Sequence, residues 1–173
     1  MLDQVTPLIL TFNEAPNLGR TLERLHWAKD VVVVDSFSTD ETMAIASRFA
    51  NVRVFQRKFE AHSHQWNFGV KETGISTEWV LALDADYILS DDLLREIQAL
   101  VPEADIAGYR ASFRYCIEGR PLRATVYTPV TVLFRRELAV YAQDGHTQRV
   151  KVEGRIPPSA RWRTMGVPTG WAL

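Results

Sequence analysis

Two aspartates stand two residues apart at Asp84 and Asp86, directly after the apolar run Trp79–Leu83. In an extended chain, residues at i and i+2 point to the same side, so both carboxylates are expected to face one ligand. Magnesium and manganese prefer such oxygen ligands and commonly combine one or two carboxylates with substrate phosphates. The pair therefore predicts a Mg²⁺ or Mn²⁺ site, although the same pattern also fits a solvated loop.

Two more polar clusters follow apolar runs. Thr11, Asn13 and Glu14 come after the first run, and Asp35 closes the run Val31–Val34. A carboxylate at such a place can accept hydrogen bonds from a base or a ribose, or it can simply begin a turn. In open α/β sheets, ligands bind outside the carboxyl ends of the strands. The three clusters are thus expected to meet at one edge of a sheet.

A further polar segment holds His62, His64, Gln65 and Asn67. The two histidines have the spacing of a zinc pair, but no cysteine or other close ligand completes a zinc site. They are interpreted either as solvated side chains or as contacts to a substrate or a phosphate.

Asp144 and His146 flank Gly145 in the second half of the chain. Asp144 is a candidate general base, because a carboxylate can remove the proton of an attacking hydroxyl. His146 is a candidate third metal ligand or phosphate donor. Asp-Gly is also an ordinary turn sequence, so the spacing alone leaves both roles open.

Up to residue 100, apolar runs alternate with helical patterns. Leu18, Leu22 and Leu25 form the stripe of an amphipathic helix. Val31–Val34 is β-branched throughout, which suits a strand buried on both faces, and Ser38 fits the N-cap of a capping box with the glutamate three residues later. The resulting β-α-β-α-β-α-β-α order predicts an α/β fold with a Rossmann-like, mostly parallel sheet and helices on both faces.

After residue 102, helical periodicity is scarce and the sequence predicts antiparallel additions to the same sheet. The predicted strands cover 106–117, 122–134 and 148–153. Prolines and glycines predict an irregular tail over 157–173. We therefore expect a single domain over 1–173, with a mostly parallel half at 1–100 and antiparallel additions at 101–156.

The composition bounds the compartment and the partners. The 173 residues are 46% hydrophobic and include a single cysteine, so no disulfide can form within the chain. The N-terminus lacks the pattern of a signal peptide, and no apolar run reaches the length of a membrane span. A cytoplasmic protein is expected, with contact at the inner face of the cytoplasmic membrane left open. The composition carries no signal of oligomeric state.

The formal net charge of −1 conceals an asymmetry between the two halves. Residues 1–100 carry 9 Lys and Arg against 15 Asp and Glu, whereas residues 101–173 carry 11 against 6, and ten of those eleven bases are Arg. This distribution argues against a uniformly basic nucleic-acid binder. Arginine recognises phosphates bidentately, so the second half suits an anionic ligand or a membrane surface, and solvated surface arginines are the alternative for most of these residues.

On these residues the sequence resembles the family 2 glycosyltransferases of GT-A fold. The matching stretches, in the order and approximate spacing of the family, are Leu8–Asn17 (LILTFNEAPN), Val31–Thr42 (VVVVDSFSTDET), Gln65–Gly69 (QWNFG) and Trp79–Asp86 (WVLALDAD). Within the family, the chain is similar to bacterial lipopolysaccharide-core β-glucosyltransferases.

The resemblance implies inverting transfer of a sugar from a nucleotide-diphosphate donor, with UDP-glucose as the guess, to a saccharide or glycolipid acceptor. It also implies that residues 1–100 form the donor half and residues 101–156 the acceptor half. The residues expected to contact the donor are Thr11, Asn13, Glu14, Asp35, Gln65, Asn67 and Asp84. Among them, Gln65 and Asn67 are expected near the diphosphate or the donor sugar. Asp84 and Asp86, with His146 as a third candidate, are expected to meet the cation that bridges the diphosphate.

The chain departs from this branch at three places. Tyr87 stands where a glutamate is usual, and His146 is followed by Thr147 where a glutamate is common, which leaves Asp144 as the expected base. The chain is also shorter than family members usually are. A truncated or non-catalytic nucleotide-sugar-binding module is therefore the alternative.

Two other enzyme classes fit less well. A sugar-nucleotide pyrophosphorylase would need a glycine-rich phosphate loop after the first strand, where residues 11–19 hold a single glycine. A phosphatase using Asp84 as nucleophile would need a Ser or Thr soon after Asp86, where Tyr87 and Ile88 stand instead.

Overall fold

The computed structural model describes residues 1–117, 120–121, 128–144, 147–157 and 162–169. The elements of the first hundred residues are η1 (Leu2–Gln4), β1 (Val5–Thr11), α1 (Ala15–Glu23), β2 (Val31–Asp35), α2 (Thr42–Ala46), β3 (Val52–Gln56), α3 (His62–Glu72), β4 (Trp79–Asp84), β5 (Ile88–Leu89) and α4 (Asp91–Ala99). Those that follow are β6 (Gly108–Ile117), β7 (Arg120–Pro121), β8 (Val130–Arg135), η2 (Arg136–Leu138), β9 (Ala139–Asp144), β10 (Thr147–Val152) and β11 (Trp162–Thr169).

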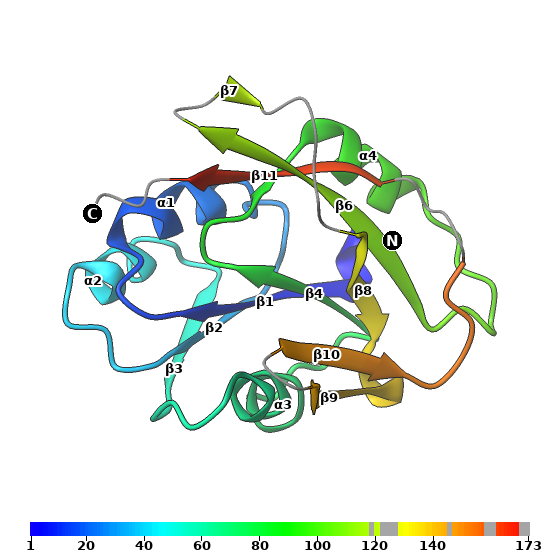
Figure 1. The fold of residues 1–173 in the computed structure, drawn as a ribbon, viewed down its shortest axis with the longest axis horizontal. Helices are drawn as coiled ribbons and strands as arrows, with labels where there is room; N and C mark the ends of the chain where they lie inside the picture. The colour runs from blue at the N-terminus through cyan, green and yellow to red at the C-terminus, as the bar shows by residue number, and fades with distance from the viewer. Residues whose placement is uncertain (118–119, 122–127, 145–146, 158–161, 170–173) are drawn as a thin grey trace.

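A large sheet of strand order β3-β2-β1-β4-β8-β6-β11-β5 runs through the molecule (Figure 1). Strands β3, β2, β1 and β4 are parallel, and β8 lies antiparallel between β4 and β6. Strands β9 and β10 form a separate antiparallel pair. This arrangement confirms the expected α/β fold, with a parallel first half and antiparallel additions after it.

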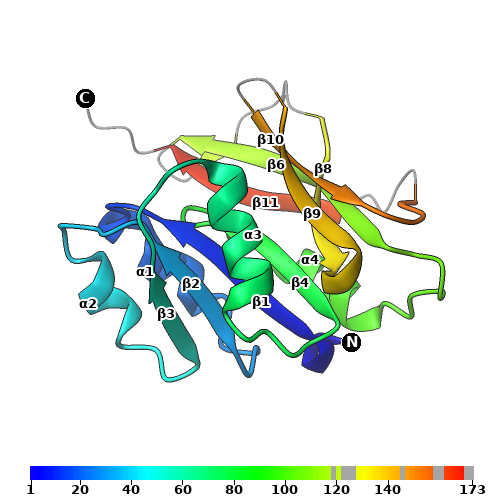
Figure 2. The ribbon, with the colours of Figure 1, turned by 90° about the horizontal axis from the view of Figure 1, so that it is seen from below.

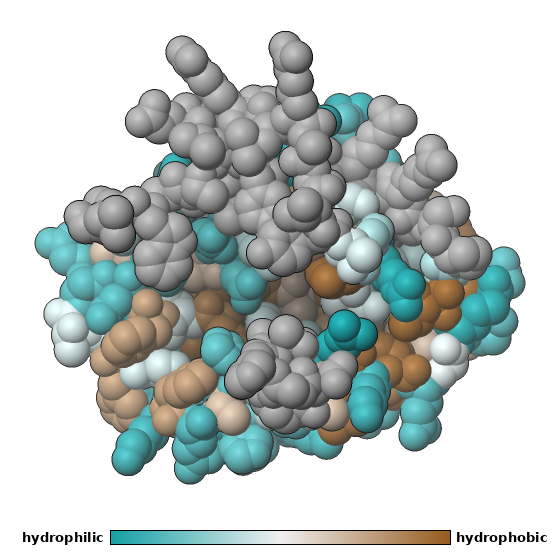
Figure 3. Space-filling view, in the orientation of Figure 1, coloured by the Kyte–Doolittle hydropathy of each residue, from teal (hydrophilic) through white to brown (hydrophobic). Residues whose placement is uncertain are grey.

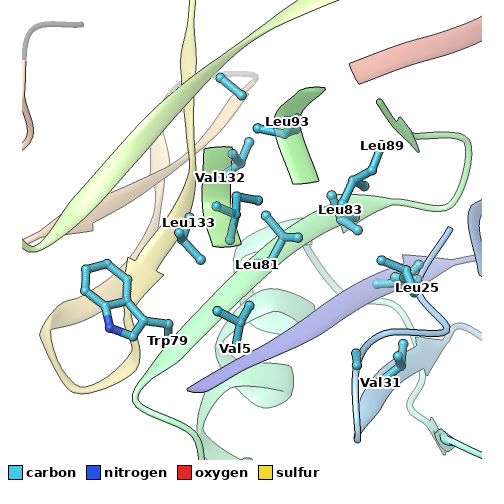
Figure 4. Packing of buried hydrophobic residues seen from close by; sticks show 14 of the residues in the cluster. Val5, Leu25, Val31, Trp79, Leu81, Leu83, Leu89, Leu93, Val132 and Leu133 are labelled. Atoms are coloured by element: carbon cyan, nitrogen blue, oxygen red, sulfur yellow. The ribbon is translucent and has the colours of Figure 1, made fainter. Parts of the chain in front are cut away.

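Helices cover both faces of the parallel strands, as predicted. Helices α1 and α4 bury their apolar stripes on one face, where side chains of β1, β2, β4 and β8 meet them (Figure 4). Helix α3 covers the other face together with β9 and β10 (Figure 2). The four valines of β2 are fully buried, because each face of that strand meets a helical layer.

Helix α3 lies unusually close to β1 because of Gly69. A Cβ atom at this position would come within 2.7 Å of the Leu8 side chain. The absence of a side chain therefore sets the distance between α3 and the sheet. This distance matters for the site, since both β1 and α3 carry predicted site residues.

The structure corrects the prediction of an irregular tail over 157–173. Residues Trp162–Thr169 form β11, which lies parallel to β6 and pairs with β5 through Met165 and Gly166. Pro168 lies in register with Cys116 of β6, beyond the two residues that pair with β5. Long-range pairing therefore overrides the local signal of proline and glycine.

Some predictions lie outside the described residues or gain only partial support. The predicted strand 122–134 is described from residue 128, where β8 begins at Val130, and the stretch 122–127 is not described. The predicted strand 148–153 corresponds to β10.

Among the described residues, no helix is long and apolar enough to cross a membrane. On the face shown in Figure 3, hydrophilic residues occupy much of the rim with hydrophobic residues between them.

Candidate active site

The carboxyl ends of β1, β2 and β4 lie side by side, and the three predicted polar clusters meet there. Thr11 at the end of β1 is in register with Asp35 at the end of β2, and Leu10 is in register with Asp84 at the end of β4. The parallel register thus brings together residues that are up to 73 positions apart, as the alternating pattern of the sequence predicts.

Asp35 is fully buried and is surrounded by protein donors. Its carboxylate accepts hydrogen bonds from the Ser38 backbone N–H at 3.0 Å, from the Ser38 hydroxyl, and from the Gln56 side chain at 3.0 Å. A carboxylate has about four lone-pair positions, so three are occupied within the protein. Direct contact between Asp35 and a ligand would require this loop to open.

The loops after β1 and β2 are joined by side-chain hydrogen bonds. The Asn13 N–H donates to the Ser38 hydroxyl at 2.8 Å, and the Asn13 side-chain oxygen accepts from the Thr39 N–H at 2.8 Å. Asn13 has a positive φ of 53°, a conformation that asparagine tolerates better than most residues. Ser38 is therefore a loop-to-loop bridge and not the N-cap that the capping-box pattern predicts.

The N-cap residue of α2 is Glu41, and the side chain of Asp40, one residue before it, bonds the starts of two helices. The Asp40 carboxylate accepts from the Thr42 N–H at 3.0 Å, at the start of α2, and from the Ala15 N–H at 3.0 Å, at the start of α1. The Thr42 hydroxyl in turn accepts from the Glu14 N–H at 2.8 Å. Burial acts to raise the pKa of Asp40, but these hydrogen bonds to Thr42 and Ala15 outweigh it and lower the pKa.

Thr11 carries a polar atom that the protein leaves without a partner. Its side chain is 5% exposed, and its hydroxyl finds no hydrogen-bond partner. A buried hydroxyl in this state costs free energy, which a ligand group bound at the strand ends would recover. Thr11 is one of the residues predicted to contact the donor.

Asp84 ends strand β4 and Asp86 lies on the turn that follows, whereas the prediction placed both on extended chain. The Tyr87 N–H donates to the Asp84 carbonyl at 3.1 Å and closes the turn, and the buried Thr21 hydroxyl of α1 donates to the Ala85 carbonyl at 2.7 Å. The turn is thus held from α1, across 64 residues of sequence. No local pattern marks Thr21 for this role.

Both carboxylates of the turn hold their protons more tightly than usual. Loss of hydration, followed by the charges of Asp84 and Glu14, raises the pKa of Asp86 to about 6. Loss of hydration also raises the pKa of Asp84, against a hydrogen bond from Tyr87 and the charge of His62. Asp84 is itself solvent-exposed, so this carboxylate is accessible yet crowded by protein groups.

The charge balance of the turn fits a divalent cation. The charges of Asp84 and Glu14 both disfavour the ionised form of Asp86, and two carboxylates are what Mg²⁺ or Mn²⁺ takes beside substrate phosphates. Within the described residues, no three His, Cys, Asp or Glu side chains form a ready-made metal site. The remaining ligands would have to come from a bound substrate, from water or from residues outside the description.

Gln65 and Asn67 of α3 are both occupied by protein partners. The buried Gln65 side chain donates to the Ser36 hydroxyl at 2.9 Å and to the Arg57 carbonyl at 3.0 Å, and accepts from the Arg57 guanidinium at 2.8 Å. The Asn67 carboxamide bonds the backbone of Tyr141. Their predicted contacts with the diphosphate or sugar stay predictions.

The two candidate residues of the acceptor half are described only in part. Asp144 is the last residue of β9, and its side chain lies outside the described part of the structure, as does the whole of His146. Tyr141, which no sequence pattern singled out, lies close enough to Asp84 for that charge to raise its pKa further after burial has raised it. It therefore borders the site.

The family described as Glycosyl transferase family 2 matches residues 8–156. The lipopolysaccharide core biosynthesis glycosyltransferase LpsC of Rhizobium meliloti is 30% identical over 140 residues, which cover 78% of this chain and 49% of that protein. An uncharacterised glycosyltransferase of Rickettsia bellii is 30% identical over 145 residues, 80% of this chain and 48% of the relative. The chain spans about half the length of the curated relatives it matches.

Solved structures share the fold at lower identity. TarS residues 1–349 of S. aureus, in complex with UDP-GlcNAc, superposes with a TM-score of 0.63 at 20% identity over 78% of this chain and 46% of that one. Glucosyl-3-phosphoglycerate synthase of Mycobacterium tuberculosis, in complex with Mn²⁺, UDP and phosphoglyceric acid, superposes with a TM-score of 0.59 at 16% identity over 79% of this chain and 57% of that one.

Proposed function

Because the chain belongs to glycosyl transferase family 2, we propose that it forms the donor-binding core of an inverting, metal-dependent glycosyltransferase. The observation that carries this proposal is the crowded carboxylate pair Asp84 and Asp86 beside the buried, unpartnered hydroxyl of Thr11. Both features gain free energy from a bound cation and a polar ligand. They lie at the sheet edge where this class of fold binds ligands.

The loops after β1 and β2 would bind the nucleoside. Thr11 offers its free hydroxyl, and Asn13 and Glu14 border the same edge. Asp35 acts by holding the loop through Ser38, so that the backbone around it is already in place when the ligand arrives. A preorganised loop loses little conformational entropy on binding.

Asp86 and Asp84 would hold the divalent cation, with the donor diphosphate supplying further oxygens. When bound, the cation neutralises the charge that develops on the leaving diphosphate. Thr21 keeps both carboxylates in place through the Ala85 carbonyl.

The transfer step forms one bond and breaks another. The oxygen of an acceptor hydroxyl attacks the anomeric carbon from the face opposite the diphosphate, and the bond between that carbon and the diphosphate oxygen breaks with its electron pair. A carboxylate of the acceptor half, proposed to be Asp144, takes the hydroxyl proton. The configuration at the anomeric carbon is thereby inverted.

The acceptor is proposed to be a saccharide or glycolipid of the cell envelope. The name of the LpsC relative and the excess of arginine in residues 101–173 support this proposal. UDP-glucose is the first donor to try, and UDP-GlcNAc the second because the TarS structure contains it. We place the protein in the cytoplasm, at the inner face of the membrane if its acceptor is a lipid.

The alternative is a module that binds a nucleotide sugar without transferring it. Tyr87 and Thr147, which stand where the resembling branch usually has glutamates, support this alternative. It predicts binding of the donor without turnover.

Calorimetry and donor turnover with and without Mn²⁺ test these proposals. Asp86→Asn is expected to reduce turnover by about 1,000-fold, since a Lewis acid supplies several kcal/mol at the transition state. The matched control is Asp92→Asn, which removes an exposed carboxylate that pairs with Arg95 on α4. Failure of every UDP-sugar to bind would overturn both proposals, whereas Mn²⁺-dependent binding without turnover would select the module.

A further inference from the structure

The side chain of Asn67 replaces a missing strand neighbour of β9. Its amide nitrogen donates to the Tyr141 carbonyl at 2.8 Å, and its oxygen accepts from the Tyr141 N–H at 2.9 Å. These are the two backbone groups that a paired strand would satisfy. One asparagine of the donor half thus holds the backbone of the acceptor half, 74 residues further along the chain.

The residue next to Asn67 strengthens the same connection. Trp66 stacks on the Tyr141 ring, with centroids 5.1 Å apart and planes 12° from parallel, and Phe134 packs edge-on against the same ring at 6.0 Å. All three rings are buried. In Figure 2, helix α3 and strand β9 lie side by side. We call the set Trp66, Asn67 and Tyr141 the clasp.

The clasp borders the carboxylate pair. Tyr141 lies within electrostatic range of Asp84, and so does His62 in the first turn of α3. Helix α3 packs closely on β1 at Gly69 and Leu8, and β1 is paired with β4, which ends at Asp84. The clasp therefore ties β9 to the strands that carry Asp84. Beyond Tyr141, β9 continues for three residues to Asp144, which is about 10 Å of extended chain.

We propose that Asn67 is a positioning residue that sets β9, and with it the acceptor side of the site, relative to Asp84. The proposal rests on the proposed transferase function. It assigns the carboxamide to the backbone of Tyr141 and not to the diphosphate or the donor sugar. A misplacement of about 1 Å at reacting groups can cost about 100-fold in rate, so the loss of this contact acts on transfer.

Asn67→Ala in the full chain tests the proposal. We expect the kcat of transfer to fall about 10- to 100-fold, while the affinity for UDP with Mn²⁺ stays within about twofold, because the nucleoside loops are held by a separate network. In the metal-free and donor-free protein, hydrogen exchange at the Tyr141 amide is expected to accelerate by at least about tenfold, since its acceptor is gone.

The matched control is Asn51→Ala. Asn51 also donates through its side chain to two backbone carbonyls, those of Leu25 at 3.2 Å and Ala28 at 2.8 Å, far from the acceptor half. A merely structural role for Asn67 predicts that both variants lower Tm and activity alike. The positioning role predicts that only Asn67→Ala separates kcat from UDP affinity.

Three results would overturn the inference: unchanged exchange at the Tyr141 amide, a fall in UDP affinity as large as the fall in kcat, or equal effects of the two asparagine variants. If the wild-type chain binds UDP but transfers nothing, the transferase proposal fails on its own. The exchange measurement still decides whether Asn67 holds β9.

Discussion

The carboxylates at the ends of β2 and β4 lie at the same sheet edge, yet the protein treats them in opposite ways. Asp35 and the nearby Asp40 each accept several hydrogen bonds from backbone and side-chain donors of the protein. Asp84 and Asp86 face each other's charge and hold raised pKa values. Asp35 and Asp40 hold the loops of the site in place, whereas Asp84 and Asp86 are available to bind a ligand such as the proposed cation.

This difference shows how carboxylates that stabilise the structure can be distinguished from carboxylates that take part in binding or catalysis. Carboxylates that satisfy themselves within the protein contribute to folding, whereas carboxylates that crowd each other cost folding free energy and persist because of function. Variants of the two regions should therefore differ in which property they change.

Asp35→Ala should have the largest effect on stability. It removes the acceptor of two donors on Ser38 and one on Gln56, at a cost of about 2–4 kcal/mol in the free energy of unfolding. Urea denaturation measures this. Asp30→Ala at the opposite end of β2, which breaks a partly exposed pair with Arg53, should cost about 1 kcal/mol or less. Equal losses of unfolding free energy in the two variants would contradict the structural role of Asp35.

The two regions should respond to pH with opposite signs. The folded pKa of Asp40 is lowered, so its contribution to stability is present above pH 4 and is lost as the pH falls. The folded pKa of Asp86 is raised to about 6, so ionising it costs stability as the pH rises from about 4 to above 6.

Thermal unfolding of the metal-free protein across pH 3 to 8 measures both changes in stability, the loss at low pH expected from Asp40 and the loss at higher pH expected from Asp86. Asp86→Asn should remove the loss at higher pH, and Mn²⁺ should offset it in the wild type, with an affinity that weakens below pH 6 as protons compete. Asp40→Asn should reduce the loss at low pH instead. A wild-type protein that gains stability between pH 4 and 7 relative to Asp86→Asn would contradict the prediction.

Thr21→Val should have a smaller effect on stability than Asp35→Ala and a specific effect on the aspartate turn. Losing the buried hydrogen bond to the Ala85 carbonyl costs about 1–2 kcal/mol. Mn²⁺ affinity is expected to fall by about tenfold, since support of metal ligands from the surrounding residues is typically worth that much. Thr21→Ser keeps the hydroxyl and serves as the control, and an unchanged Mn²⁺ affinity in Thr21→Val would show that the turn holds itself.

The parallel core and the gathering of the three clusters were predictable from the sequence. The valines of β2 and the apolar run of β4 identify buried strands without any partner being known, and the alternation with helices orders them. The register then places Thr11, Asp35 and Asp84 at one edge, because parallel strands end together.

The remainder of the site depends on contacts across long stretches of sequence. Thr21 meets Ala85 across 64 residues and Asn67 meets Tyr141 across 74, and neither contact leaves a periodic trace. Ser38 fits a capping box in the local sequence, but its hydroxyl accepts a hydrogen bond from the Asn13 N–H of the neighbouring loop instead. Tertiary competition of this kind is invisible to local pattern.

The pairing of β5 with β11 has a consequence for how the site is acquired during synthesis. Strand β5 begins two residues after Asp86, yet its hydrogen-bonded partners Met165 and Gly166 emerge from the ribosome more than seventy residues later. Until then, the chain that leaves the aspartate turn has an unpaired edge. Since nonlocal pairings form late in folding, the nucleoside loops should be in place well before the turn that is proposed to hold the cation.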